Sequence, residues 1–227
     1  MNFKRCRTKR DYPWRQAWTL VVVLLCVTIV SMEASAYGVR ERLVPILGVT
    51  MDKGKEPTGM VTNLLLSFEE RADPSGLAVQ FRSAPGRFSH LSQTAIQQAI
   101  YRAAKVAGLS TDTWTIMLSV PEPGLIVYGD SLSAMVALSV VALAKGEEVL
   151  PDRVLTGTVT TDGQIAHVGS LPLKVEAAYQ AHIRRVLVPD ELDITDGDWE
   201  TPFLMQVSPV RSVSQAYLEL TDHPLLP

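Results

Sequence analysis

The segment after Ser133 restricts the fold more than any other part of this chain. It reads Ala134-Met135-Val136-Ala137-Leu138-Ser139-Val140-Val141-Ala142-Leu143-Ala144 and ends at Lys145-Gly146. The run is apolar on nearly every side, and a glycine at its end is typical of a helix stop. A helix without a polar face has to be covered by other elements, so we expect it to be buried in a packed domain.

Strand-like and helix-like patterns surround this helix. After the first 40 residues, turn clusters separate three short apolar runs, which predicts strands that pair in antiparallel fashion. Further along the chain, strand-like and helix-like patterns alternate. The strands are expected at 43–50, 59–68, 77–81, 113–120, 154–159, 164–168, 185–188 and 203–207, and the other helices at 91–107, 171–182 and 212–220. This order predicts an α/β or α+β domain in which helices cover the sheet.

The first 36 residues have the three-part order of a secretory signal. A basic start precedes the apolar run Ala17 to Val30, and Ala34-Ser35-Ala36 provides a cleavage site before Tyr37. The run is shorter than the roughly 20 residues of a comfortable membrane span, which favours cleavage over an anchor. We expect residues 37–227 to be exported, either free in the periplasm or outside the cell, or anchored through residues 17–32 if the segment stays uncut.

Composition excludes several kinds of site from the exported part. Both cysteines, Cys6 and Cys26, lie in the first segment, so disulfides, thiol chemistry and cysteine zinc sites are not expected beyond it. The chain has 21 basic and 24 acidic residues, and removing the six basic and two acidic residues of the first 36 leaves 15 and 22. Such an acidic remainder argues against nucleic-acid binding. No GxxxxGK[ST] or HExxH pattern occurs, so we expect no nucleotide or metal cofactor.

Ser133 is the candidate nucleophile. It stands where a loop meets the start of the apolar helix, and helix-start N–H groups are unpaired and partly positive, so they can stabilise an oxyanion. The alternative is that Ser133 only caps the helix, a position where serine is common.

Lys174 is the candidate general base. It lies among Leu171, Leu173 and Val175 in the first turn of its expected helix, where burial and the helix dipole both lower the pKa of an amine. A neutral amine is what a base for serine requires. The alternative is that the aliphatic stem packs while the ammonium reaches water.

Four blocks in register resemble the proteolytic domain of Lon proteases, the S16 peptidases, and most of all its archaeal membrane-bound branch with the serine motif Gly-Asp-Ser-x-Ser. The blocks are Gly129-Asp130-Ser131-Leu132-Ser133, Leu155-Thr156-Gly157-Thr158-Val159-Thr160-Thr161-Asp162-Gly163-Gln164-Ile165, Val168-Gly169-Ser170-Leu171-Pro172-Leu173-Lys174-Val175-Glu176-Ala177-Ala178 and Ile183-Arg184-Arg185-Val186-Leu187-Val188-Pro189. The resemblance implies an α+β fold of mixed sheets flanked by helices.

The resemblance also implies residue roles. Ser133 matches the family's nucleophile, Lys174 its general base, Asp130 an acidic residue near the active site, and Thr156 a threonine that helps to position the lysine. The implied reaction is hydrolysis of peptide bonds through an acyl-enzyme, without metal or organic cofactor.

Departures from the family's pattern affect the expected substrates. Ser170 stands where the family usually has glycine, and Leu132 and Met135 add bulk beside the nucleophile. Without an ATPase module, such a domain is expected to cleave only flexible or unfolded polypeptides and to need no ATP. The resemblance leaves open whether it forms a homo-oligomer and whether a separate chain supplies an unfoldase.

Two other classes of function compete with an exported Ser-Lys peptidase. One is a non-catalytic Lon-like domain that serves interaction or assembly, against which the presence of both Ser133 and Lys174 counts. The other is a hydrolase unrelated to Lon, which would need His90 or His167 beside Ser133.

Overall fold

The computed structural model describes residues 38–51, 56–191, 196–197 and 199–226. The helices of this part are α2 (His90–Val106), α3 (Ser133–Lys145), α4 (Leu171–Gln180) and α5 (Val213–Thr221). The strands are β1 (Arg40–Thr50), β2 (Thr58–Glu70), β3 (Ala78–Phe81), β4 (Arg87–Phe88), β5 (Trp114–Ser119), β6 (Ile126–Val127), β7 (Arg153–Leu155), β8 (Thr158–Val159), β9 (Ile165–Ala166), β10 (Arg185–Pro189) and β11 (Gln206–Val210).

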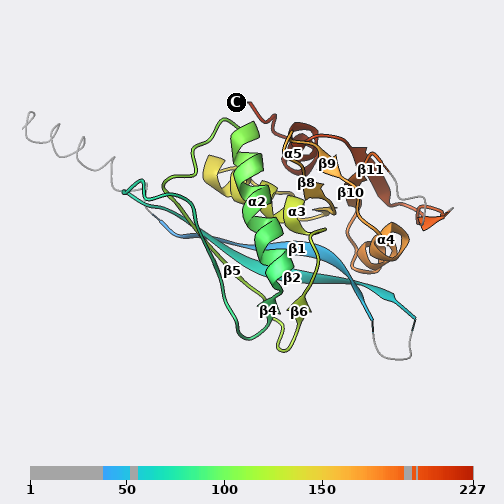
Figure 1. The fold of residues 1–227 in the computed structure, drawn as a ribbon. Coiled ribbons are helices and arrows are strands. Elements are labelled where there is room, and N and C mark those ends of the chain that lie inside the picture. The colour runs from blue at the N-terminus through green and yellow to red at the C-terminus, as the bar shows by residue number, and fades with distance from the viewer. Residues whose placement is uncertain (1–37, 52–55, 192–195, 198, 227) are drawn as a thin grey trace, which may run out of the picture. The chain divides into compact units, whose positions relative to one another are not determined.

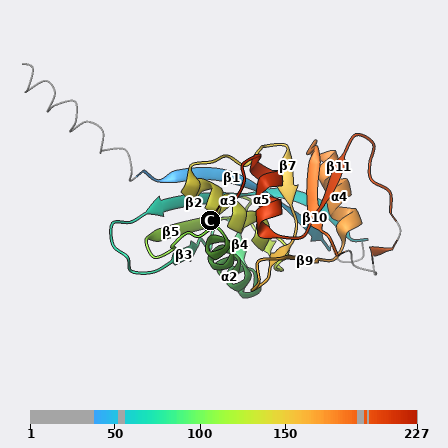
Figure 2. The same ribbon diagram turned by 90° about the horizontal axis from the view of Figure 1, so that it is seen from above.

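Two larger sheets and two short strand pairs make up the β-structure. The larger sheet has the order β1-β2-β5-β3, antiparallel except between β3 and β5, and the second has the parallel order β11-β10-β7. The long β1–β2 hairpin pairs Arg40 with Phe68 and Thr50 with Thr58. Helix α3 lies over the part of this hairpin nearer to β5 and packs against α2, and α4 lies over the other end of the hairpin (Figures 1 and 2).

Helix α3 occupies the centre of the domain, as its sequence predicts. It contacts α2, α5, the β1–β2 hairpin, β7 and β8, and every residue from Ser133 to Leu143 is buried. Because it has neighbours on all sides, no polar face is needed. The mixed sheets with flanking helices confirm the predicted α+β class.

The helices differ in how they begin. The Ser89 hydroxyl caps α2 by accepting the Ser92 N–H at 3.2 Å, and the Ser212 hydroxyl caps α5 by accepting the Gln215 N–H at 3.2 Å. Neither α3 nor α4 has such a cap from its own N-cap side chain. The two helices that begin at the candidate site thus leave their first N–H groups to other partners.

Some expected strands differ in the structure. The strand expected over 154–159 is two strands, β7 and β8, because Gly157 bonds to the loop before α3 between them. The strand expected over 203–207 is β11, three residues later, because Pro202 to Met205 form a turn closed by the Met205 N–H and the Pro202 C=O at 3.1 Å. The loop expected over 121–129 contains β6, which pairs with β4.

The expected signal or anchor, Ala17 to Val30, lies outside the described residues, so the division into 1–36 and 37–227 stays a prediction. Within the residues that the structure does describe, no helix is both long and apolar enough to cross a membrane.

Candidate active site

The loop between β6 and α3 carries two serines in different surroundings. Ser131 is half-buried and lines a pocket. Ser133 is the first residue of α3, is 1% exposed, and has a hydroxyl with no hydrogen-bond partner within the described part of the chain. The N-cap residue is Leu132, so the alternative in which Ser133 merely caps the helix is wrong.

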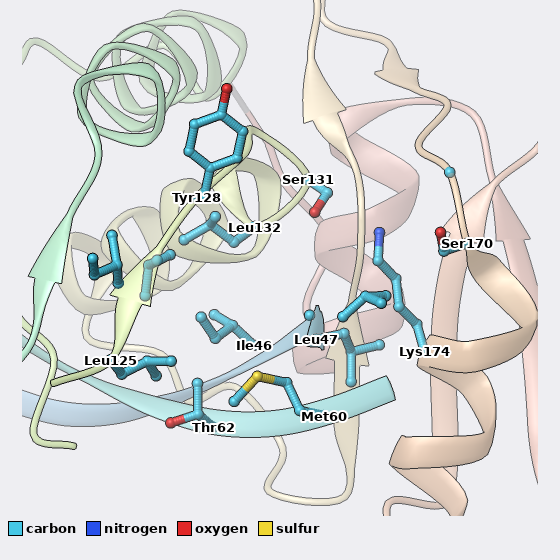
Figure 3. A pocket seen from close by; sticks show the side chains of 15 residues that line it. Ile46, Leu47, Met60, Thr62, Leu125, Tyr128, Ser131, Leu132, Ser170 and Lys174 are labelled. Carbon is cyan, nitrogen blue, oxygen red and sulfur yellow. The ribbon is translucent and has the colours of Figure 1, made fainter. Parts of the chain in front are cut away.

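The pocket has a volume of about 280 Å³ and lies between the β1–β2 hairpin, the loop before α3 and the start of α4 (Figure 3). Ser131 and Lys174 both line it and project into the same end of it, whereas Ser133 is not among its lining residues. Its walls combine polar groups with apolar side chains, among them Ile46, Leu47, Met60, Leu125 and Leu132. A substrate in this pocket would meet the hydroxyl of Ser131, and the position of Ser133 does not favour the predicted role as nucleophile.

Lys174 lies in the first turn of α4, which packs against β1 and β2, and its side chain is 5% exposed. Burial is the largest influence on its pKa and lowers it to about 8, while the negative charges of Asp196 and Asp130 act in the opposite direction. So little exposure does not fit the alternative in which the ammonium reaches bulk water. A buried amine with a lowered pKa is suited to accept a proton near neutral pH.

Gly157 and Thr156 hold the serine loop in place. The Gly157 N–H donates to the Ser131 C=O at 2.7 Å, and the Ala134 N–H donates to the Gly157 C=O at 3.1 Å. The Thr156 hydroxyl donates to the same Ser131 C=O at 3.4 Å. The hydrogen bond of this side chain thus supports the serine loop, whereas the resemblance assigns Thr156 to positioning of the lysine.

The start of α3 offers backbone donors beside Ser131. The Ser133 N–H is used by the Asp130 C=O at 2.9 Å, which closes the turn before the helix. The N–H groups of Ser131 and Leu132 donate to no other group in the described ranges. Unpaired N–H groups at a helix start can stabilise negative charge on a substrate oxygen.

Two carboxylates, one before Lys174 in the chain and one after it, raise the pKa of its amine. Asp130 is exposed and lies in the serine loop, as its place in the motif predicts. Asp196 comes from the acidic connection between β10 and β11, and its two oxygens accept the N–H groups of Ser170 at 2.9 Å and Leu171 at 3.2 Å. Asp196 lies between the strands expected at 185–188 and 203–207, where no motif or periodic pattern singles it out as a site residue.

The pocket lining contains no histidine among the described residues, and His90 and His167 are both exposed. This arrangement gives no support to a hydrolase that uses histidine as its base. The part of the chain with described positions also holds no group of three or more His, Cys, Asp or Glu residues that could bind a metal ion.

Comparison with known proteins agrees with these features. The model of the Lon protease (S16) C-terminal proteolytic domain matches residues 89–215. The archaeal Lon protease of Archaeoglobus fulgidus is 26% identical over 133 residues, which are 58% of this chain and 21% of that protein. The archaeal Lon protease of Methanothermobacter thermautotrophicus is 30% identical over 106 residues, 47% of this chain and 16% of that protein.

A bacterial relative gives a similar result. The Lon protease of Erwinia amylovora is 28% identical over 130 residues, which are 56% of this chain and 17% of that protein. The matched part of this chain thus spans about a fifth of the length of these relatives. Because the family model covers more than half of the chain, including the serine loop and the start of α4, the chain belongs to the family of Lon protease (S16) C-terminal proteolytic domains.

Proposed function

We propose that this chain is a serine peptidase domain in which Ser131 is the nucleophile and Lys174 the general base. The observation that carries the proposal is that both side chains line one pocket, while Ser133 is buried outside its lining. This proposal keeps the predicted Ser-Lys dyad and moves the nucleophile two residues toward the N-terminus.

The first half of the reaction forms an acyl-enzyme. Neutral Lys174 takes the proton of the Ser131 hydroxyl as its oxygen attacks the scissile carbonyl carbon. The resulting oxyanion would lie against the N–H groups of Ser131 and Leu132. Protonated Lys174 then gives its proton to the leaving nitrogen, the C–N bond breaks, and an ester remains on Ser131.

Hydrolysis of the ester repeats these steps with water. Lys174 accepts a proton from the attacking water, and the collapsing intermediate releases the carboxylic acid while Ser131 regains its proton. Every proton passes through one amine, whose pKa of about 8 lies close to neutral pH. No cofactor takes part in any of these steps.

The substrate class follows from the site and from the family. A pocket of about 280 Å³ has room for only a short segment of a polypeptide, which favours flexible or unfolded chains as substrates. Independence of ATP is part of the proposal, since the 227 residues contain no GxxxxGK[ST] pattern for phosphate binding. A homo-oligomer and a partner unfoldase remain predictions, which sedimentation of the purified chain and co-purification would test.

The deciding experiment measures cleavage of a fluorescein-labelled unfolded protein, without ATP, by the purified full chain. Ser131→Ala and Lys174→Met should each lower kcat/KM by about a thousandfold or more, because each removes a group that acts in every step. Ser133→Ala, a matched control two residues away, should remain within about threefold of the parent.

Other outcomes would point elsewhere. Activity lost in Ser133→Ala and kept in Ser131→Ala, with both folded, would restore Ser133 as the nucleophile. A folded but inert parent chain would favour the alternative function, a non-catalytic Lon-like interaction domain.

The exported location is a further part of the proposal. It is supported by the basic start, the apolar run and the Ala-Ser-Ala site at 34–36. Mass spectrometry of the mature chain should find Tyr37 at the N-terminus if the segment is cleaved. An intact N-terminus in the membrane fraction would indicate an anchor through residues 17–32 instead.

A further inference from the structure

The N-terminus of α4 is closed by a side chain from a distant part of the chain. Ser170 occupies the N-cap position, but its own hydroxyl makes no capping hydrogen bond. The carboxylate of Asp196 instead accepts the N–H of Ser170 with one oxygen and that of Leu171 with the other, at 2.9 and 3.2 Å. A negative charge at a helix N-terminus is favourable, because the exposed N–H groups there are partly positive.

Ser170 also needs this support because of its backbone. Its φ and ψ are 60° and 37°, in the left-handed region that glycine adopts without cost. For a residue with a Cβ this conformation is unfavourable. Hydrogen bonds to a charged acceptor are stronger than those between neutral groups, so the two bonds to Asp196 offset that cost. Asp196 thus stabilises a conformation that serine alone would avoid.

The turn that Asp196 holds is the turn that carries Lys174. The Lys174 N–H donates to the Ser170 C=O at 3.2 Å, so the backbone of Ser170 directs the first turn of α4. Displacement of Ser170 would shift the lysine relative to Ser131, which belongs to a different element. A shift of about 1 Å between reacting groups can lower a rate roughly a hundredfold.

Asp196 also acts on the charge of the lysine. Of the charged groups in the described residues, Asp196 and Asp130 are the two whose charges influence Lys174, with Asp196 the stronger. Both raise the pKa of the amine, in opposition to burial. No charged group of β1, β2 or β10, the strands packed against α4, has such an influence within that part of the chain.

We propose that Asp196 is the positioning residue of Lys174, which it serves by clamping the Ser170 and Leu171 N–H groups at the start of α4. The inference rests on the proposed function of Lys174 as the base. Asp196 itself touches no reacting atom, so its effects reach the reaction through the lysine.

The first test compares pH profiles of kcat/KM for the full chain and for Asp196→Asn. Loss of the negative charge should move the acid limb by about half a pH unit or more to lower pH. Loss of one clamping oxygen should lower the plateau by about tenfold. Asp190→Asn is the matched control on the same connection, because Asp190 pairs with Arg211 and leaves Lys174 unaffected. Its profile should stay unchanged.

Two further variants separate geometry from charge. Asp196→Glu keeps the charge, so its acid limb should stay near that of the parent while its plateau falls. Ser170→Gly combined with Asp196→Asn should recover part of the plateau, because glycine adopts the left-handed conformation without the clamp. An unchanged profile and plateau in Asp196→Asn would overturn the proposal, as would a plateau that Ser170→Gly fails to raise.

A second readout does not depend on peptidase activity. With ¹³C-labelled lysine, the NMR titration of the Lys174 side chain gives its pKa directly, and the missing signal in Lys174→Met assigns it. The titration midpoint should fall in Asp196→Asn and stay in place in Asp190→Asn. If the parent chain cleaves nothing but the Lys174 midpoint falls in Asp196→Asn, the peptidase proposal is refuted while the influence of Asp196 on Lys174 is confirmed. An unshifted midpoint would refute the role of Asp196 whether or not the chain cleaves.

Discussion

Replacement of Ser133 by alanine should stabilise this protein without loss of activity. The hydroxyl is buried and has no hydrogen-bond partner in the described part of the chain, so it loses its bonds to water on folding without compensation. An unsatisfied group of this kind costs about 1–3 kcal/mol. Removing one oxygen leaves a void of about 20 Å³ at most, which costs roughly 0.5 kcal/mol.

The net gain in the free energy of unfolding is therefore about 0.5–2.5 kcal/mol. In a domain of this size each kcal/mol raises Tm by about 2–4 °C, so calorimetry should detect a rise of roughly 1–10 °C. The matched control is Ser139→Ala in the same buried helix. The Ser139 hydroxyl donates to the Met135 C=O at 2.8 Å, and its removal should give no gain.

The two measurements on Ser133→Ala test the reasoning together. A Tm equal to or below that of Ser139→Ala would show that the Ser133 hydroxyl has a partner. Loss of cleavage in a folded Ser133→Ala would show that this hydroxyl is the nucleophile after all. Either result would remove the basis for moving the nucleophile to Ser131.

Three more variants test the surroundings of the site. Lys174→Met should raise the free energy of unfolding at pH 7 by on the order of 3 kcal/mol, because a pKa lowered to about 8 in the folded state means that burial disfavours the charged amine. In urea titrations this gain should shrink as pH rises from about 8 to about 10.4, because in that range the unfolded state binds more protons than the folded one. A gain that stays constant with pH would contradict the lowered pKa of Lys174. Gly59→Ala should cost about 3 kcal/mol or more and reduce cleavage, because the added Cβ would overlap the Leu173 carbonyl of α4, and an unchanged Tm would refute this close approach. Tyr217→Phe should lower the free energy of unfolding by about 1–2 kcal/mol, because the buried Tyr217 hydroxyl donates to Glu147 at 2.6 Å; no change in chemical denaturation would argue against that bond.

Much of the fold could be predicted because local patterns agree with it. The apolar run after Ser133 predicts a buried helix, and the apolar runs separated by turn clusters near the start predict the antiparallel pairing seen in the β1–β2 hairpin. The errors arise where long-range contacts override the local pattern. Gly157 looks like part of a strand, but its N–H and C=O bond to the serine loop rather than to a neighbouring strand.

The site could be predicted less completely. Lys174 was recognisable because a lysine among apolar residues in a first helical turn is unusual, and its burial is confirmed. The choice between Ser131 and Ser133 depends on where α3 begins, and sequence patterns locate helix ends only to within a few residues. Asp196 was not recognisable, because a contact across 26 residues leaves no periodic pattern in an acidic loop.

The complete burial of α3 affects how related sequences should be interpreted. Every position from Ser133 to Leu143 is constrained by packing, so a descendant without activity would keep a similar apolar stretch simply in order to fold. Stability does not favour a lysine at position 174, because an apolar replacement would make the domain more stable. The lysine would therefore be lost once catalysis is no longer required. Among homologues of this chain, the lysine is therefore a better marker of retained enzymatic activity than the conspicuous helix that follows the serines.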